Sequence, residues 1–142
     1  MRITLSAFLL AFCASATGLE TPQTRVETIV QSSQSWNGSS LPMYPSGKPV
    51  VTILKITIPP GVSLPVHQHH VINAGVLLEG ELTVHTEAGD TLHMKQGDPI
   101  VEVVNQWHHG VNEGTVPAVI LVFYAGAQGE VNTQVRTASE AQ

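Results

Sequence analysis

Short β-rich runs separated by turn residues dominate the chain from residue 50 onward. The run VVTILKITI covers residues 50–58 and is followed by Pro-Pro-Gly, and the apolar run PAVILVFYAG covers residues 117–126. Between them, turn signals recur about every 8 to 12 residues, which is the spacing of β-sandwiches and barrels. No convincing amphipathic helix interrupts the series. The pattern therefore predicts an all-β fold.

The segment before this series has a different character. Residues 26–31 (VETIVQ) alternate weakly and are a candidate first strand. Residues 32–49 are rich in Ser, Gly and Pro, which is typical of a long loop. We expect Trp36 and Tyr44 to anchor this loop on the core, with lining a pocket as the alternative.

The first 16 residues have the pattern of a secretory signal peptide. Arg2 precedes an apolar stretch at 3–12, and residues 14–16 (ASA) form a small-x-small cleavage site. The apolar stretch is shorter than the roughly 20 residues that span a bilayer. A lipoprotein is less favoured, because a bulky Phe precedes Cys13, and a retained N-terminal helix is also less favoured than a signal peptide. We expect cleavage after residue 16, export to the periplasm or the extracellular space, and no membrane attachment afterwards.

Charge and cysteine content narrow the possible partners. The formal net charge is −5, and removal of Arg2 with the signal peptide makes it more negative by one. This charge argues against nucleic acid and anionic membranes as partners. Cys13 is the single cysteine, so the mature chain has no disulfide. Only 12 % of the residues are charged, which favours an additional face buried in a homodimer.

Three histidines lie within four positions, at His67, His69 and His70. Side chains alternate between the two faces of a strand, so His67 and His69 are expected to point the same way and His70 the opposite way. Two imidazoles on one face can bind one metal ion, and Asn73 continues their face if the strand runs that far. A third imidazole would come from another part of the fold, and the candidates are His85, His93, His108 and His109.

At these residues the chain resembles the cupins. The first motif of that family matches in the spacing of Gly61, His67, His69, Asn73 and Gly80, except that the family usually has Glu where Asn73 stands. The resemblance covers about residues 48–126.

The second cupin motif is also recognisable. It matches in the spacing of Gly97, Val103, Asn105, His108 and Asn112. The family usually has Pro where Val103 stands and Gly where Asn105 stands.

The resemblance implies an antiparallel jelly-roll barrel of six to eight strands with a metal ion in its mouth. His67, His69 and His108 would be the imidazole ligands, and Asn73 would stand in the place of the carboxylate ligand. The implied organisation is a signal peptide (1–16), an N-terminal strand and loop (17–47), the barrel (48–126) and a C-terminal tail (127–142). The remaining histidines are expected at the surface or partly buried; they are His70, His85, His93 and His109.

Loss of the carboxylate at Asn73 changes the expected chemistry. The metal would be a single divalent transition ion, Fe, Mn, Ni, Cu, Co or Zn, all of which accept imidazole. With three neutral imidazoles as ligands, the metal ion would keep its full charge. The affinity of the site for the metal should therefore fall, and the Lewis acidity of the bound metal should rise. Asn73 could coordinate through its amide oxygen, or hydrogen-bond a metal-bound water, and a degenerate metal-free site is the remaining alternative.

Several other side chains near the motifs are candidates for a place in the cavity. Glu79 and Glu81 flank a turn and are expected in solvent. Glu102 interrupts the apolar run IVEVV, where a buried carboxylate costs free energy unless it is paired, so the favoured interpretation is an outward position. Trp107 is expected to pack outside the cavity. Tyr124 could reach the cavity, but this is the less favoured interpretation of its position.

These features predict an exported cupin metalloenzyme that acts on a small molecule. A dioxygenase or a metal-assisted isomerase or lyase would fit a three-histidine site. The alternatives are a non-catalytic protein that binds a small ligand or a metal, and a structural dimerisation domain with a decayed site. Because one fold hosts many activities, the fold does not decide between them.

Overall fold

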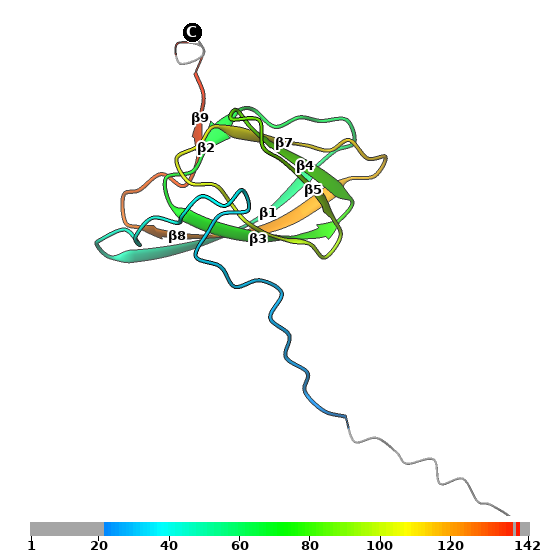
Figure 1. Ribbon diagram of the computed structural model, residues 1–142, viewed down its shortest axis with the longest axis horizontal. Coiled ribbons are helices and arrows are strands. Elements are labelled where there is room, and N and C mark those ends of the chain that lie inside the picture. Colours follow the sequence, from blue (N-terminus) through cyan, green and yellow to red (C-terminus); the bar gives the residue numbers. More distant parts are fainter. Residues whose placement is uncertain (1–21, 138, 140–142) are drawn as a thin grey trace, which may run out of the picture.

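The computed structural model describes residues 22–137 and 139, and these form a β-domain preceded by an extended segment (Figure 1). The described residues contain nine strands. Their bounds are β1 (Pro49–Ile58), β2 (His67–Gln68), β3 (Ile72–Glu79), β4 (Glu81–Thr86), β5 (Thr91–Lys95), β6 (Pro99–Val101), β7 (His108–Val111), β8 (Ala118–Ala127) and β9 (Gln134–Val135). The all-β prediction is confirmed.

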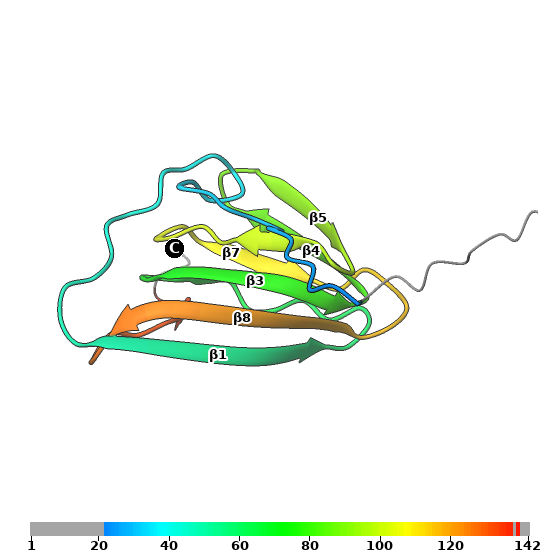
Figure 2. The ribbon, with the colours of Figure 1, turned by 90° about the horizontal axis from the view of Figure 1, so that it is seen from below.

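The strands form two antiparallel sheets that lie one above the other, the jelly-roll arrangement expected from the sequence (Figure 2). The order is β1-β8-β3-β6 in the four-stranded sheet and β5-β4-β7-β2-β9 in the five-stranded sheet. There are more strands than the six to eight expected, because β2 and β9 are short strands of two residues each.

The turn between β3 and β4 requires glycine. Gly80 has a φ of +74°, in the left-handed region that other residues adopt only at a cost. A Cβ atom at this position would lie 2.5 Å from the backbone oxygen of Pro117. The turn therefore places the loop after β7 directly against the β3–β4 corner.

The core lies between the two sheets and takes side chains from both. Ile58, Leu77 and Ala118 are fully buried in the four-stranded sheet, and Leu82 and Val84 face them from β4. Asn112 is also fully buried, and its side-chain amide donates to the carbonyl oxygens of Ile58 and Val116. Asn112, which ends the second motif, thus connects the two sheets through hydrogen bonds.

The segment before β1 differs from the expectation in two respects. Residues 26–31 are exposed and form no strand, so their weak alternation did not indicate a strand. Trp36 packs on the core as predicted, but Tyr44 is 75 % exposed and does not anchor the loop. The expected signal peptide, residues 1–16, lies outside the described residues.

The last described residues add to the barrel. β9 lies within the segment expected as a tail and pairs with β2. Arg136 forms an ion pair with Glu87, and its guanidinium lies 4.6 Å from the centre of the Trp107 ring. Trp107 therefore packs outside the cavity, as predicted. In the part of the chain that the structure describes, no helix is long and apolar enough to cross a membrane.

Candidate metal centre

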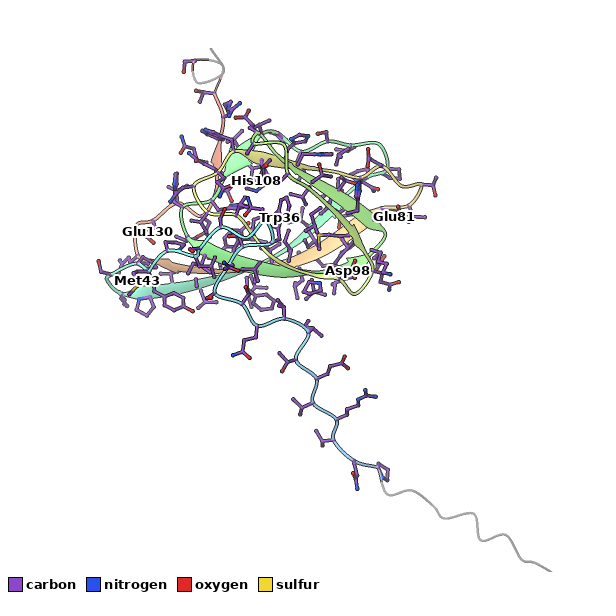
Figure 3. All side chains as sticks on the ribbon, viewed as in Figure 1. Trp36, Met43, Glu81, Asp98, His108 and Glu130 are labelled. Atoms are coloured by element: carbon purple, nitrogen blue, oxygen red, sulfur yellow. The ribbon has the colours of Figure 1, made fainter. Side chains whose placement is uncertain are left out.

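Three histidines from the five-stranded sheet converge at one end of the domain. His67 on β2 and His108 on β7 are direct cross-strand partners, and His69 follows β2 immediately. One ring nitrogen from each lies within 4.8 Å of the others. Figure 3 labels His108 in this cluster, together with Trp36 from the loop before β1. The structure thus brings together the three imidazoles that the motifs singled out.

Each of the three rings has its Nδ1 atom occupied. Nδ1 of His67 donates to the carbonyl oxygen of Pro65 (2.7 Å), and Nδ1 of His108 donates to that of Gln106 (2.8 Å). Nδ1 of His69 lies 3.1 Å from both the carbonyl oxygen of Asn132 and the hydroxyl of Thr133. Because a carbonyl oxygen only accepts, each Nδ1 carries the proton. Each neutral ring then has its lone pair on Nε2.

The environment keeps these rings neutral. Burial lowers the pKa of His67 and of His108, and it lowers the pKa of His69 to about 3, with help from the two neighbouring rings. Nε2 of His108 is buried without a hydrogen-bond partner. Neutral rings whose other nitrogen donates to a carbonyl have the orientation of metal-bound histidines in proteins. An unpartnered buried lone pair also fits a site that a cation completes.

Position 73 faces the same space from the opposite sheet. Asn73 on β3 is 2 % exposed and lines the cavity, and its Nδ2 atom is buried without a hydrogen-bond partner. Its cross-strand neighbour Tyr124 lines the cavity too, with its ring centre 5.4 Å from that of His69. The expectation that Tyr124 stays out of the cavity is therefore wrong. Burial raises the pKa of its phenol.

Glu102 also lines the cavity, so the prediction that it points outward is wrong. It is 8 % exposed and lies just after β6. Its Oε1 atom accepts hydrogen bonds from the indole N–H of Trp36 (2.9 Å) and the backbone N–H of Val103 (2.8 Å). Its Oε2 atom lies 3.8 Å from Nε2 of His108. Burial raises the pKa of this carboxyl, and the two donors oppose the rise.

The two departures from the second motif now have a structural explanation. Asn105 has a φ of +56°, a region that glycine adopts freely and that asparagine tolerates better than most residues. Val103 provides the backbone N–H that binds Glu102, which a proline at this position would lack.

The remaining histidines lie outside the cluster, as predicted. His70 is exposed and is held between the side-chain oxygens of Asn105 and Gln134, which raise its pKa. His93 is exposed, and His85 and His109 are half-buried with their ring centres 5.3 Å apart. None of these four rings lines the cavity.

The cavity is small and mostly apolar. It has a volume of about 240 Å³. This is below the roughly 300–1,000 Å³ of pockets for drug-sized ligands, so it suits a small molecule. Its apolar walls come from both sheets and include Leu54, Ile56, Leu82, Val84, Ile120 and Val122.

Sequence reasoning missed the residues that orient the cluster. The carbonyl groups of Pro65, Gln106 and Asn132 carry no residue-specific signal, because every residue has a carbonyl. For Glu102 a signal did exist. It has the same strand parity as Ile100, which is buried on the inner face.

Comparison with known protein families gives one match over this region. Residues 54–124, half of the chain, match the family model described as the cupin domain. This range contains the three histidines, Asn73 and Glu102.

A curated relative matches a shorter part of the chain. It is the cupin-domain-containing oxidoreductase virC of Hypocrea virens, 33 % identical over 64 residues, which cover 44 % of this chain and 33 % of the relative. The match thus spans only about a third of that protein's length.

Solved structures share the fold at low sequence identity. A double-stranded β-helix protein of Klebsiella pneumoniae superposes with a TM-score of 0.51 at 19 % identity, over 81 % of this chain and 99 % of that one. The DMSP lyase DddQ of Ruegeria pomeroyi superposes with a TM-score of 0.53 at 21 % identity, over 60 % of this chain and 42 % of that one. At these identities the likeness establishes the fold alone.

Proposed function

This chain belongs to the cupin domain family, and on that premise we propose that it is a metal-dependent enzyme that acts on a small molecule. The observation that carries the proposal is the convergence of His67, His69 and His108, whose ring nitrogens lie within 4.8 Å of one another at a small cavity. Their Nδ1 atoms are already hydrogen-bonded, which leaves Nε2 of each ring for a ligand bond.

Imidazole nitrogen suits Fe, Mn, Ni, Cu, Co and Zn, so these are the candidate ions. A bound ion would supply Lewis acidity, and a redox-active ion would also supply electron transfer to an oxidant. Asn73 lines the same cavity and is a candidate fourth ligand through its amide oxygen.

Oxidation of a small organic molecule is the reaction we favour, in the manner of a dioxygenase. The curated relative is named as a cupin-domain-containing oxidoreductase, which supports this choice. A metal-assisted elimination or isomerisation is the second candidate, because an ion bound to the three histidines would supply the Lewis acidity that such a reaction needs. Elimination and isomerisation develop negative charge on the substrate, which a cationic centre would stabilise.

The protein's own side chains would bind and orient the substrate. The apolar walls from both sheets exclude water, which strengthens electrostatic interactions within the cavity. The ring of Tyr124 lies beside that of His69 and lines the cavity, and its hydroxyl, which shares a hydrogen bond with Thr133, would donate to an anionic substrate group. A small, mostly apolar substrate with one anionic or carbonyl group fits this arrangement.

Elemental analysis of the purified chain tests the proposal. We expect about one transition-metal ion per chain, lost in His67→Ala, His69→Ala and His108→Ala. His93→Ala is the matched control, because His93 is exposed and lies outside the cavity. Oxygen consumption and product release by the metal-loaded protein, screened over small acids and carbonyl compounds, would then separate oxidation from elimination.

Two results would contradict the proposal. A protein that takes up none of the six ions would indicate a decayed or purely structural site. A protein that binds metal through the three histidines but turns over no substrate would indicate a binding module.

We also propose that the chain is exported. The support is the N-terminal pattern of Arg2, an apolar stretch and a small-residue cleavage site. Mass spectrometry of the secreted or periplasmic protein should give the mass of a chain beginning at residue 17. Recovery of the full-length chain from the cytoplasm would contradict export.

A homodimer is the expected assembly. The outer face of β1 and β8 exposes Val51 (71 %), Ile53 (55 %) and Phe123 (43 %), and Ile53 and Phe123 are cross-strand partners. Exposed apolar patches of this kind mark interaction surfaces. Light scattering should give twice the chain mass, and Ile53→Lys should give the monomer mass. A monomeric wild-type chain would refute the assembly.

A further inference from the structure

Two electron-rich groups face each other in the buried end of the cavity. Nε2 of His108 has no hydrogen-bond partner, and Oε2 of Glu102 lies 3.8 Å away. Because Nδ1 of His108 donates to Gln106, a neutral ring has no proton on Nε2 to offer the carboxylate. The separation is also too long for a direct hydrogen bond. A positive charge between the two atoms would satisfy both.

The separation suits a shared metal ion. Bonds from a divalent transition metal to imidazole nitrogen and carboxylate oxygen are each about 2.1 Å long, so two such ligand atoms lie at most about 4.2 Å apart. The 3.8 Å between Nε2 of His108 and Oε2 of Glu102 falls within this limit.

Glu102 stands directly across from position 73. In the β3–β6 pairing, Ala74 is the partner of Val101, and the next pair brings Asn73 beside Glu102. The backbone N–H of Glu102 donates to the carbonyl oxygen of Asn73 (3.1 Å), which confirms this juxtaposition. Residues directly opposite in an antiparallel pair project to the same face. A carboxylate at either position therefore reaches the same end of the cavity.

Hydrogen bonds from the loop before β1 and from the backbone hold Glu102 in place. Trp36, from the loop before β1, and the backbone of Val103 both donate to Oε1. The hydroxyl of Ser35 donates to the backbone oxygen of Glu102 (2.9 Å). These bonds fix one carboxylate oxygen and leave the other toward His108.

We propose that Glu102 is the anionic ligand of the metal centre, in place of the carboxylate that position 73 lacks. The proposal rests on the proposed metal site and adds its fourth protein ligand. It also explains the neutral residue at 73. Two carboxylates directly opposite on one face would repel each other, so a carboxylate at 102 favours an uncharged partner. Asn73 then contributes shape and polarity without charge.

The proposal is tested by removing the carboxylate at position 102, adding one at position 73, and combining the two changes. Apoprotein is titrated with Zn²⁺ and with Co²⁺ against a chromophoric chelator, for the wild type, Glu102→Gln, Asn73→Glu and the double variant. Glutamine keeps an oxygen that can accept from Trp36 and Val103, so Glu102→Gln preserves the supporting hydrogen bonds. We expect Glu102→Gln to weaken Zn²⁺ binding by at least about 10- to 100-fold, because loss of a group that only orients a metal ligand already costs that much.

The double variant separates ligation from a structural role. Asn73→Glu combined with Glu102→Gln returns one carboxylate to the site from the neighbouring strand, and we expect most of the lost affinity to return. The Co²⁺ absorption spectrum should change in Glu102→Gln and move back toward the wild-type spectrum in the double variant. Trp36→Phe, which loosens the carboxylate without removing it, should weaken binding less than Glu102→Gln.

The outcomes distinguish this proposal from the proposed function. If the wild-type chain binds no metal, the three-histidine site itself fails. If the wild type binds metal and Glu102→Gln binds it with unchanged affinity and spectrum, the histidine site stands and Glu102 is not a ligand. Should Glu102→Gln fail to fold, isotope-edited infrared spectra of the wild type decide. A glutamate carboxylate band that changes on metal addition supports ligation, and an unchanged set of bands overturns it.

Discussion

The inner face of strand β3 has a polar end and an apolar end. Asn73, near its start, faces the three histidines, and Leu77, four residues later, is fully buried in the core. The cross-strand partners on β8 follow the same division, with Tyr124 beside Asn73 and Ile120 beside Leu77. One strand thus serves the site at one end and the stability of the barrel at the other.

The two ends differ in whether their buried polar atoms have hydrogen-bond partners. At the apolar end, burial of hydrocarbon stabilises the fold by about 25 cal/mol per Å². At the polar end, Nδ2 of Asn73 and Nε2 of His108 are buried without partners. Each such atom costs about 1–3 kcal/mol. Two unpartnered buried polar atoms at this end fit the proposed site, where a bound group would complete them.

The largest expected effect comes from the apolar end. Leu77→Ala should lower the free energy of unfolding by about 2–5 kcal/mol, because it removes a fully buried side chain and leaves a cavity. Leu78→Ala is the matched control, since Leu78 is 38 % exposed. Urea unfolding followed by circular dichroism measures both. A small loss for Leu77→Ala would show that this end is not the stabilising one.

Metal binding should stabilise the protein only through the polar end. At a free metal concentration 100 times Kd, the folded state gains about 2.7 kcal/mol by linkage. The melting temperature should therefore rise on metal addition and fall again with a chelator. The rise should disappear in His69→Ala and persist in Leu77→Ala. If both variants kept the rise, the metal would be binding elsewhere.

Removing the hydrogen bond from Trp36 to Glu102 should have a smaller effect on the free energy of unfolding. Trp36→Phe keeps most of the ring that packs on the core and removes the N–H that donates to Glu102. We expect a loss of about 1.5–3 kcal/mol in the free energy of unfolding, the range for one hydrogen bond to a charged group, because Val103 still donates to the same oxygen. Thermal unfolding of the apoprotein measures it. An unchanged stability would show that Trp36 acts through packing alone.

The smallest effects are expected at the loop that carries the second motif. Asn105→Ala should cost about 1–2 kcal/mol, because alanine at a φ of +56° is strained. Asn105→Ala and Asn105→Gly both lose the hydrogen bond to His70, but glycine adopts this φ without strain. The stability of Asn105→Gly should therefore lie closer to that of the wild type. Equal losses in the two variants would assign the effect to the side-chain bond rather than to φ.

Much of the fold was predictable from the chain. The strands at 50–58 and 117–126 and the turn at Gly80 follow from alternation and turn chemistry, and the structure has them nearly as expected. The shared orientation of His67 and His69 follows from strand periodicity, although β2 ends at Gln68 and His69 lies just beyond it. The weak alternation at residues 26–31 suggested a strand that the structure does not have, because these residues pair with no other strand in the described part of the chain.

The candidate site was predictable only in part. The three histidines were identified from motif spacing, and the structure gathers them. Glu102 was assigned outward because a carboxylate within an apolar run is more often solvated. It is buried because Trp36, distant by 66 residues, supplies a donor.

The sequence by itself determined the main strands between residues 50 and 126 and the shared orientation of His67 and His69, because periodicity is a local property of the backbone. Only the tertiary structure decided which polar groups meet. The carbonyl groups that orient the rings of His67, His69 and His108, and the N–H groups that hold Glu102, come from loops and from a neighbouring strand. Such contacts depend on how distant segments pack, and no local pattern encodes them.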